Sequence, residues 1–176
     1  MRRNILVFGL ISGGLVGLFL VCGTLINFKG GAWFGYSTMI VALSLIYVGV
    51  RNFRDKYNEG VISFGKALAI AMGITLIAST IYVLVWLVEF YGFMPDFMDK
   101  YAAMLAQQAR AGSHNPADLQ KRLAEIESVR VAYRNPIVVV LYTYAEILPV
   151  GIIISLLTAL LLKRKRQPSP VSALTA

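Results

Sequence analysis

Residues 67–88 read ALAIAMGITLIASTIYVLVWLV, a run without one charged side chain. A helix needs about 20 apolar residues to cross a hydrocarbon core about 30 Å thick. Further runs close to or above that length lie at residues 5–26, 34–50 and 137–162. The sequence therefore predicts an all-α integral membrane protein with four transmembrane helices.

The composition fits a membrane protein and argues against nucleic acid as a partner. Hydrophobic residues make up 57% of the chain and charged residues only 15%, and the mean hydropathy is +0.67. The net charge is +8, but the basic residues flank the apolar runs instead of forming one long patch. We therefore expect the lipid bilayer as a partner and no nucleic acid.

The distribution of basic residues predicts the orientation of the chain, because those close to helix ends are retained in the cytoplasm. The richer side carries Arg2, Arg3, Arg51, Arg54, Lys56, Lys66, Lys163, Arg164, Lys165 and Arg166. On the other side, the basic residues are nearly balanced by acidic ones such as Glu89 and Asp96. We predict a membrane protein with both termini in the cytoplasm. Aromatic residues are expected to form a belt at its outer interface, namely Trp33, Phe34, Tyr36, Trp86, Phe90 and Tyr91.

The largest polar region lies between the third and fourth apolar runs and carries two helical patterns. The first places Phe97 and Tyr101 on one helix face. The second begins at Asn115-Pro116, where asparagine caps the helix and proline takes its first position. Asn135-Pro136 marks its end, because the residue before a proline disfavours the helical conformation. The sequence thus predicts an extracytoplasmic helical hairpin at about residues 95–134.

This hairpin belongs to a predicted membrane domain at residues 1–166, which is followed by a disordered cytoplasmic tail at residues 167–176. Two roles for the hairpin are open. It can pack on the outer membrane surface and merely connect two helices. Alternatively, it recognises a periplasmic partner or ligand.

Small residues recur at four-residue spacing along three of the predicted helices. Such spacing lets helix backbones approach closely in a bilayer, where the hydrophobic effect no longer drives association. The predicted packing faces are Gly9, Gly13 and Gly17; Gly65, Ala69 and Gly73; and Gly151, Ser155 and Ala159. The sequence does not decide whether these faces meet within one chain or between chains.

One ionisable residue lies deep in a predicted transmembrane helix. Glu146 is about 13.5 Å along the helix from Ile137 at 1.5 Å per residue, which is close to the bilayer midplane. An intramembrane carboxyl is a functional candidate by default, because a charge there costs roughly 2.5 to 3.5 kcal/mol. Pro149 lacks a backbone donor and is expected to kink the helix, freeing the Ala145 carbonyl beside the carboxyl. Glu146 and Pro149 thus form a candidate ion or proton site.

A structural role for Glu146 is the alternative. A protonated carboxyl can hydrogen-bond to Tyr142 or Thr143, one turn away, and serve only to stabilise helix packing. Hydroxyl groups of the third helix offer further partners, from Ser79, Thr80 or Tyr82.

The direction of Glu146 also bears on oligomerisation. At about 100° per residue, Gly151, Ser155 and Ala159 lie about 140° to 220° around the helix from the carboxyl. Both sides of the fourth helix must then be covered. This motivates the hypothesis of a homo-oligomer.

Nothing in the sequence specifies an enzyme, a metal site or a cofactor. The chain has one cysteine and one histidine, Cys22 and His114, which are far apart in sequence. The carboxylates of the outer loop lack a nucleophile and base at catalytic spacing. We therefore expect no catalytic residues, no metal and no cofactor.

Four motifs in order carry a resemblance to a known family: IYVGVR at 46–51 with RD at 54–55, GVISFGKA at 60–67, YRNP at 133–136 and EILPVG at 146–151. Together they resemble domain-of-unknown-function family 4199, a family of small bacterial membrane proteins typical of the Bacteroidetes. The resemblance covers nearly the whole chain except the basic tail. It implies a four-helix inner-membrane protein whose family has no established activity.

Two functional interpretations follow. We favour a non-enzymatic interaction or structural component of the membrane, with an unknown periplasmic or membrane protein as its partner. The alternative is a small oligomeric proton or ion transporter, or channel component, that uses Glu146. Such a path requires several chains, because four helices offer few lining residues.

Overall fold

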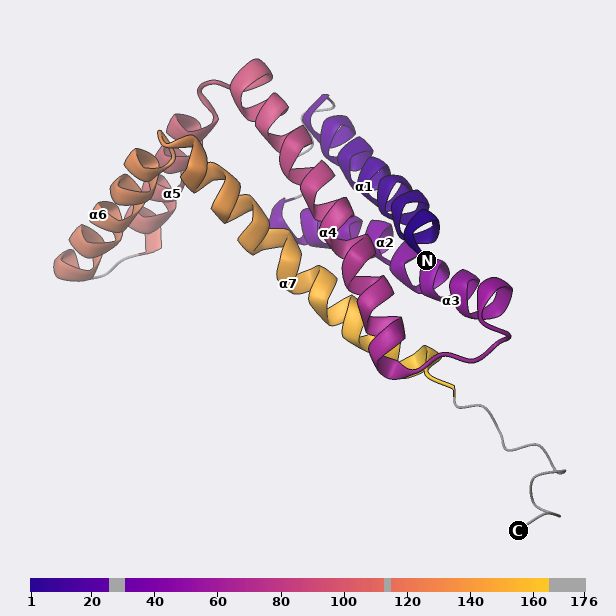
Figure 1. Ribbon diagram of the computed structural model, residues 1–176. Helices are drawn as coiled ribbons and strands as arrows, with labels where there is room; N and C mark the ends of the chain where they lie inside the picture. The colour runs from indigo at the N-terminus through magenta and orange to yellow at the C-terminus, as the bar shows by residue number, and fades with distance from the viewer. Residues whose placement is uncertain (26–30, 113–114, 165–176) are drawn as a thin grey trace, which may run out of the picture. The chain divides into compact units, whose positions relative to one another are not determined.

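The computed structural model describes residues 1–25, 31–112 and 115–164 (Figure 1). The helices are α1 (Arg2–Leu25), α2 (Gly31–Leu43), α3 (Leu45–Tyr57), α4 (Phe64–Val88), the π-helical turn η1 (Glu89–Phe93), α5 (Phe97–Gly112), α6 (Pro116–Ala132) and α7 (Pro136–Leu162). No strand forms within the described ranges, where an isolated bridge joins Ile62 and Arg164. The predicted tail at residues 167–176, the basic residues Lys165 and Arg166, and His114 lie outside the described residues.

Four stretches of the described residues are long and apolar enough to cross a membrane. They are Arg2–Leu25, Gly35–Tyr57, Phe64–Phe93 and Pro136–Leu162. The predictions of an all-helical fold and of four helices able to span a membrane are therefore confirmed.

The second of these stretches differs from the predicted span at residues 34–50. The helix changes at Ser44, between α2 and α3, where the serine hydroxyl donates a hydrogen bond to the Val41 carbonyl at 2.6 Å. Such local bonds compete with regular helical hydrogen bonding. Beyond residue 50, α3 continues to Tyr57, and Phe53 remains buried while its charged neighbours lie nearer the surface.

The chain divides into two compact units, each with its own apolar core. The first unit comprises Met1–Tyr82 and Glu146–Ala176, and the second comprises Val83–Ala145. Helices α4 and α7 therefore contribute residues to both units.

In the first unit, α1 and α4 run parallel, with glycine on one helix facing isoleucine on the other. A Cβ atom built at Gly9 of α1 would lie 2.7 Å from the Cβ of Ile77. One turn earlier the roles reverse, because a Cβ built at Gly73 of α4 would lie 2.9 Å from Ile5. Glycine at these positions lets the two helices approach more closely than any larger residue would allow.

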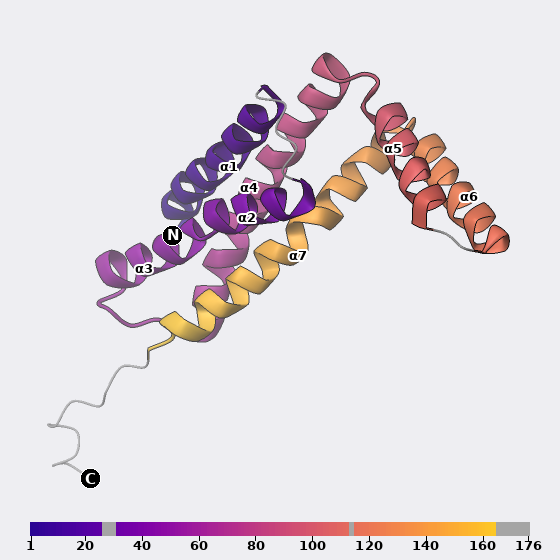
Figure 2. The same ribbon diagram turned by 180° about the vertical axis from the view of Figure 1, so that it is seen from behind.

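Buried polar side chains join α1 to α2 and α3, which run antiparallel to it. Asn4 donates to the Gly49 carbonyl at 2.9 Å and accepts from the Asn52 amide at 2.8 Å. Further along α1, the Ser12 hydroxyl donates to the Ala42 carbonyl at 2.7 Å. The N-terminal turn of α1 consequently lies beside α3 (Figures 1 and 2).

The α7 part of the first unit runs antiparallel to α4. The hydroxyls of Thr75 and Ser155 lie 2.8 Å apart in the buried interface. At the end of the unit, the backbones of Ile62 and Arg164 exchange two hydrogen bonds of 3.0 and 2.9 Å. The pairings of α1, α3, α4 and α7 place these basic residues at one end of the first unit: Arg2, Arg3, Arg51, Arg54, Lys56, Lys66, Lys163 and Arg164.

The second unit contains α5 and α6, which pack against each other as a hairpin. Asn115 caps α6, as the sequence predicts, because its side chain accepts a hydrogen bond from the Ala117 amide. The chain turns into α7 at Asn135, whose side-chain oxygen accepts from the Ile137 amide at 3.0 Å.

Two of the aromatic residues predicted for an interfacial belt form part of the core of the second unit. The ring centroids of Trp86 and Phe97 lie 5.2 Å apart, and those of Phe90 and Tyr133 lie 6.2 Å apart. Phe90 is buried, whereas Tyr91 and Trp33 are exposed. Apolar side chains of α5 and α6 thus cover Phe90, whereas Trp86 is half-buried beside them.

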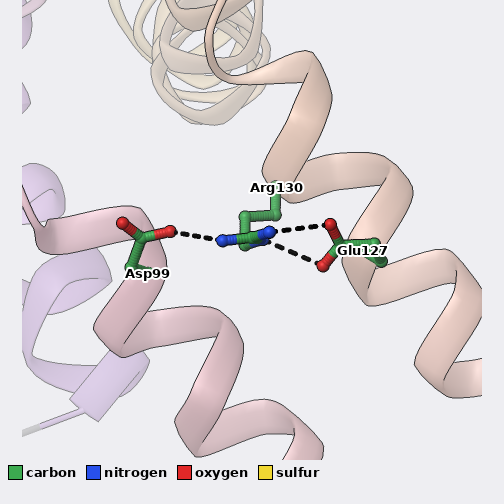
Figure 3. A network of polar contacts seen from close by, with 3 residues as sticks. All are labelled: Asp99, Glu127 and Arg130. Carbon is green, nitrogen blue, oxygen red and sulfur yellow. Dashed lines mark hydrogen bonds and ion pairs between the residues drawn. The ribbon is translucent and has the colours of Figure 1, made fainter.

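An ion-pair network joins the two helices of the hairpin (Figure 3). The Arg130 guanidinium donates to the Asp99 carboxylate on α5 at 2.7 Å. It also forms a bidentate pair with Glu127 on its own helix, at 2.8 and 2.9 Å. This fork geometry suits a guanidinium and a carboxylate, so Arg130 fixes the register of α6 against α5.

We predict that acid loosens this hairpin. Hydrogen bonding from Arg130 holds the pKa of the Glu127 carboxyl below its ordinary value of 4.5. A lowered pKa means that the stabilisation is complete above pH 4.5 and is lost as the pH falls through the lowered value. Amide exchange in α6, corrected for intrinsic rates, should therefore accelerate below pH 4.5.

Glu127→Gln is the matched control for this prediction, because the amide keeps the shape of the side chain and cannot titrate. The variant should exchange faster than wild type at neutral pH and show a smaller acceleration in acid. An identical acid response in both proteins would rule out the Glu127–Arg130 pair as its cause.

Candidate functional site

Glu146 is the only charged residue in α7, and it lies near the middle of that helix. It is about 15 Å from Pro136 and about 24 Å from Leu162 at 1.5 Å of rise per residue. The side chain is exposed on the surface of the chain. Helix α7 continues through Pro149, which is also exposed and offers no amide hydrogen to the Ala145 carbonyl.

Within the described residues, the Glu146 carboxyl has no hydrogen bond and no ion pair. The two predicted partners on its own helix are engaged elsewhere, in the second unit. The Thr143 hydroxyl donates to the Val139 carbonyl at 2.8 Å. The Tyr142 ring lies 5.3 Å from that of Tyr133, centroid to centroid.

The hydroxyls of α4 do not bond to Glu146 either. Thr80 donates to the Leu76 carbonyl at 2.8 Å. Ser79 is fully buried, and its hydroxyl has no hydrogen-bond partner among the described residues. The Glu146 side chain is therefore exposed and lacks, among the described residues, the hydrogen bond within the chain that the sequence offers as an alternative.

The opposite side of α7 is the tightly packed one. Gly151, Ser155 and Ala159 are all buried. A Cβ built at Gly151 would overlap the methyl group of Thr75, and Ser155 pairs with the hydroxyl of the same threonine. The small face of α7 is thus covered by α4 of the same chain, while the Glu146 face is left uncovered.

The other predicted packing residues differ in their surroundings. Gly9, Gly13 and Gly17 are buried, and Gly9 and Gly13 meet isoleucines of α4. On α4, Gly73 contacts Ile5, but Gly65 has open space around it and Ala69 is exposed. Equal spacing in the sequence therefore marks positions with different environments.

Glu89, which the sequence places among the acidic residues of the less basic side, is a buried residue in the structure. Glu89 lies in the π-helical turn η1 and has an exposed fraction of only 4%. Its carbonyl accepts from the Met94 amide at 2.9 Å, which closes the wider turn. Single π turns often occur at functional sites. No pattern in the sequence signals this one.

Gly49 is a second position that the spacing analysis missed. A Cβ built there would lie 2.7 Å from Ile74 and 2.9 Å from Phe8, so two helices pack closely against this glycine.

A metal site finds no support in the described part of the chain, where no three side chains of His, Cys, Asp or Glu come together.

These features define a class: a small helical protein with four segments able to span a membrane and a lone carboxyl exposed halfway along the last of them. The chain belongs to the family described as protein of unknown function (DUF4199), which matches residues 7–164. No curated protein and no solved structure matches the chain. The family therefore supplies no residue roles, and the function rests on the geometry of α7.

Proposed function

We propose that this protein is a non-enzymatic component of the bacterial inner membrane that acts by associating with other protein inside the bilayer. The contact surface is the exposed face of α7 around Glu146. One observation carries the proposal: Glu146 is exposed near the middle of a helix whose other residues are uncharged.

The energetic argument concerns what surrounds that face in a membrane. A charged carboxylate at the helix centre costs roughly 2.5 to 3.5 kcal/mol on insertion scales, and such residues normally face protein or water. The chain itself covers the opposite side of α7 and leaves Glu146 without a partner in the described residues. A protein surface that supplies a hydrogen bond at this depth offsets part of that cost.

The basic end of the first unit supports an orientation for this component. Basic residues near helix ends are retained in the cytoplasm, so this end is cytoplasmic, together with both termini. The α5–α6 hairpin follows the opposite end of α4 in the sequence, and this supports a periplasmic position for it. There it is available to a further periplasmic partner.

Site-specific photo-crosslinking in intact cells tests the proposal. A benzophenone amino acid replaces Ile153, which is exposed on α7 about 20° around the helix from Glu146. We expect irradiation to give a discrete protein adduct. The same amino acid at Leu10, an exposed position on α1, is the control and should give little or none. Equal yields at the two positions would contradict the proposal.

A small oligomeric proton or ion transporter, or channel component, is the second candidate, and the same carboxyl favours it. An intramembrane carboxyl can bind a cation or exchange a proton. Several chains are needed to enclose a path, since four helices provide few lining residues. In this case Glu146 faces the path between the chains.

Ion flux into liposomes decides between the two candidates. The purified wild type and Glu146→Gln are compared at matched insertion and folding, with proton and alkali-cation indicators. The interaction proposal predicts the same background flux in both proteins. Flux that is present in wild type and lost in Glu146→Gln would favour the transport function instead.

A further inference from the structure

We propose that the partner on the exposed face of α7 is a second copy of this chain, related by a two-fold axis along the membrane normal, with Glu146 of each copy opposite Glu146 of the other. This inference rests on the proposed function and names its partner. It follows from the chemistry of the carboxyl and from what the chain offers at the same depth.

A protonated carboxyl is self-complementary, because it has one hydroxyl donor and a carbonyl acceptor. In a two-fold interface, a residue close to the axis meets its own counterpart. Two Glu146 side chains can therefore satisfy each other when one or both are protonated. No other polar group is needed at the contact.

The rest of the face suits a flat helix-to-helix contact. Ile153, Leu157 and Leu160 lie within about 40° of Glu146 around the helix and are exposed by 58%, 53% and 50%. Pro149 lies between them and the carboxyl on the same side. After Glu146 this stripe is apolar, and one turn before Glu146 the exposed Tyr142 lies about 40° around the helix. The carboxyl is therefore the polar group within an otherwise apolar C-terminal part of the stripe.

The described spans carry no cation at the depth of Glu146. Helix α7 has no basic residue. The basic residues of the other described spans lie at the ends of these spans: Arg2, Arg3, Arg51, Arg54, Lys56 and Lys66. On this stripe a second copy offers its own Glu146 carboxyl at the same depth, with the exposed Tyr142 one turn away.

The single cysteine of the sequence allows a clean test by disulfide crosslinking. In a Cys22→Ser background, one cysteine at a time replaces Ile153, Leu157, Leu160 or, as the control, Leu10 on α1. Mild oxidation is applied in native membranes. We expect a dimer of the 19.4 kDa chain from α7 positions and little from Leu10→Cys.

Two further variants assign the contact to the carboxyl. In the Ile153→Cys protein, Glu146→Gln keeps a donor and an acceptor, so the dimer yield should stay close to that of Ile153→Cys alone. Glu146→Leu removes both, and we expect a yield about tenfold lower, as one or two lost interhelical hydrogen bonds imply. Matched insertion of all variants excludes misfolding as the cause.

The outcomes separate this inference from the proposed function. The second copy would be overturned if disulfide yields on α7 were no higher than at Leu10 and the photoadduct at Ile153 had a mass other than that of two copies of the chain. The interaction function would then remain. Neither a disulfide nor a photoadduct on α7 would overturn both. A dimer that is insensitive to Glu146→Leu would refute the role of the carboxyl pair.

Discussion

Replacing Gly13 with valine should lower the free energy of unfolding by about 1–3 kcal/mol, the usual cost of overpacking a close contact. A Cβ built at Gly13 would lie 2.6 Å from the Cδ1 of Ile81 and 3.1 Å from the Cα of Ala78. The second distance involves backbone, so a side-chain rotation cannot relieve it. Reversible unfolding in mixed detergent micelles measures the change.

Gly14→Val is the matched control for this experiment. The two glycines are neighbours in α1, and valine has the same helix propensity at both, but nothing lies within 4 Å of a Cβ built at Gly14. We therefore expect Gly14→Val to cost much less. Equal losses at the two positions would contradict the packing of α1 on α4.

The second large effect concerns the contact between α7 and α4. Gly151→Ala should cost about 1–3 kcal/mol of unfolding free energy, because the new methyl group meets the Thr75 methyl group. Thr75→Ser removes that methyl group and keeps the hydroxyl that pairs with Ser155. In the Thr75→Ser background, Gly151→Ala should therefore cost considerably less.

A double-mutant cycle over Gly151→Ala and Thr75→Ser measures this rescue. Residues in direct contact show interaction energies of about 0.5–3 kcal/mol, whereas independent sites add. We expect a coupling energy in that range. The double variant should lose less unfolding free energy than the sum of the losses in the two single variants. Strict additivity would mean that α7 does not pack on α4 at this point.

The spanning segments were predictable because a long apolar run is a local property of the sequence. The second of them shows the limit of that reasoning. Its continuation to Tyr57 carries charged residues, which a hydropathy reading excludes, yet one side of α3 is buried through Phe53. The change of helix at Ser44, where the serine hydroxyl donates to the Val41 carbonyl, has no signal in the composition.

Packing partners were harder to predict than packing faces. Four-residue spacing identified Gly9 and Gly13, but the same spacing also selected Gly65 and Ala69, which have open surroundings. A glycine is needed only where another helix approaches, and this depends on the neighbour and not on the spacing. Trp86 is a similar case: it packs against the hairpin because the ring of Phe97, on α5, lies next to it.

For the candidate site, the sequence predicted the residue and its depth but not its surroundings. A carboxyl in the middle of an apolar run is visible without a structure. Its exposure is not, since Tyr142, Thr143 and Ser79 were all within plausible reach of Glu146. In the structure the first two are engaged elsewhere, and the Glu146 side chain is exposed without a hydrogen bond among the described residues.

The most direct test of association through α7 is the mass of the protein extracted from its own membrane in nanodiscs, without detergent. We predict particles with more protein than one 19.4 kDa chain, and a shift toward the single chain in Glu146→Leu. A wild-type protein that is a single chain without any other protein in such nanodiscs would contradict the account.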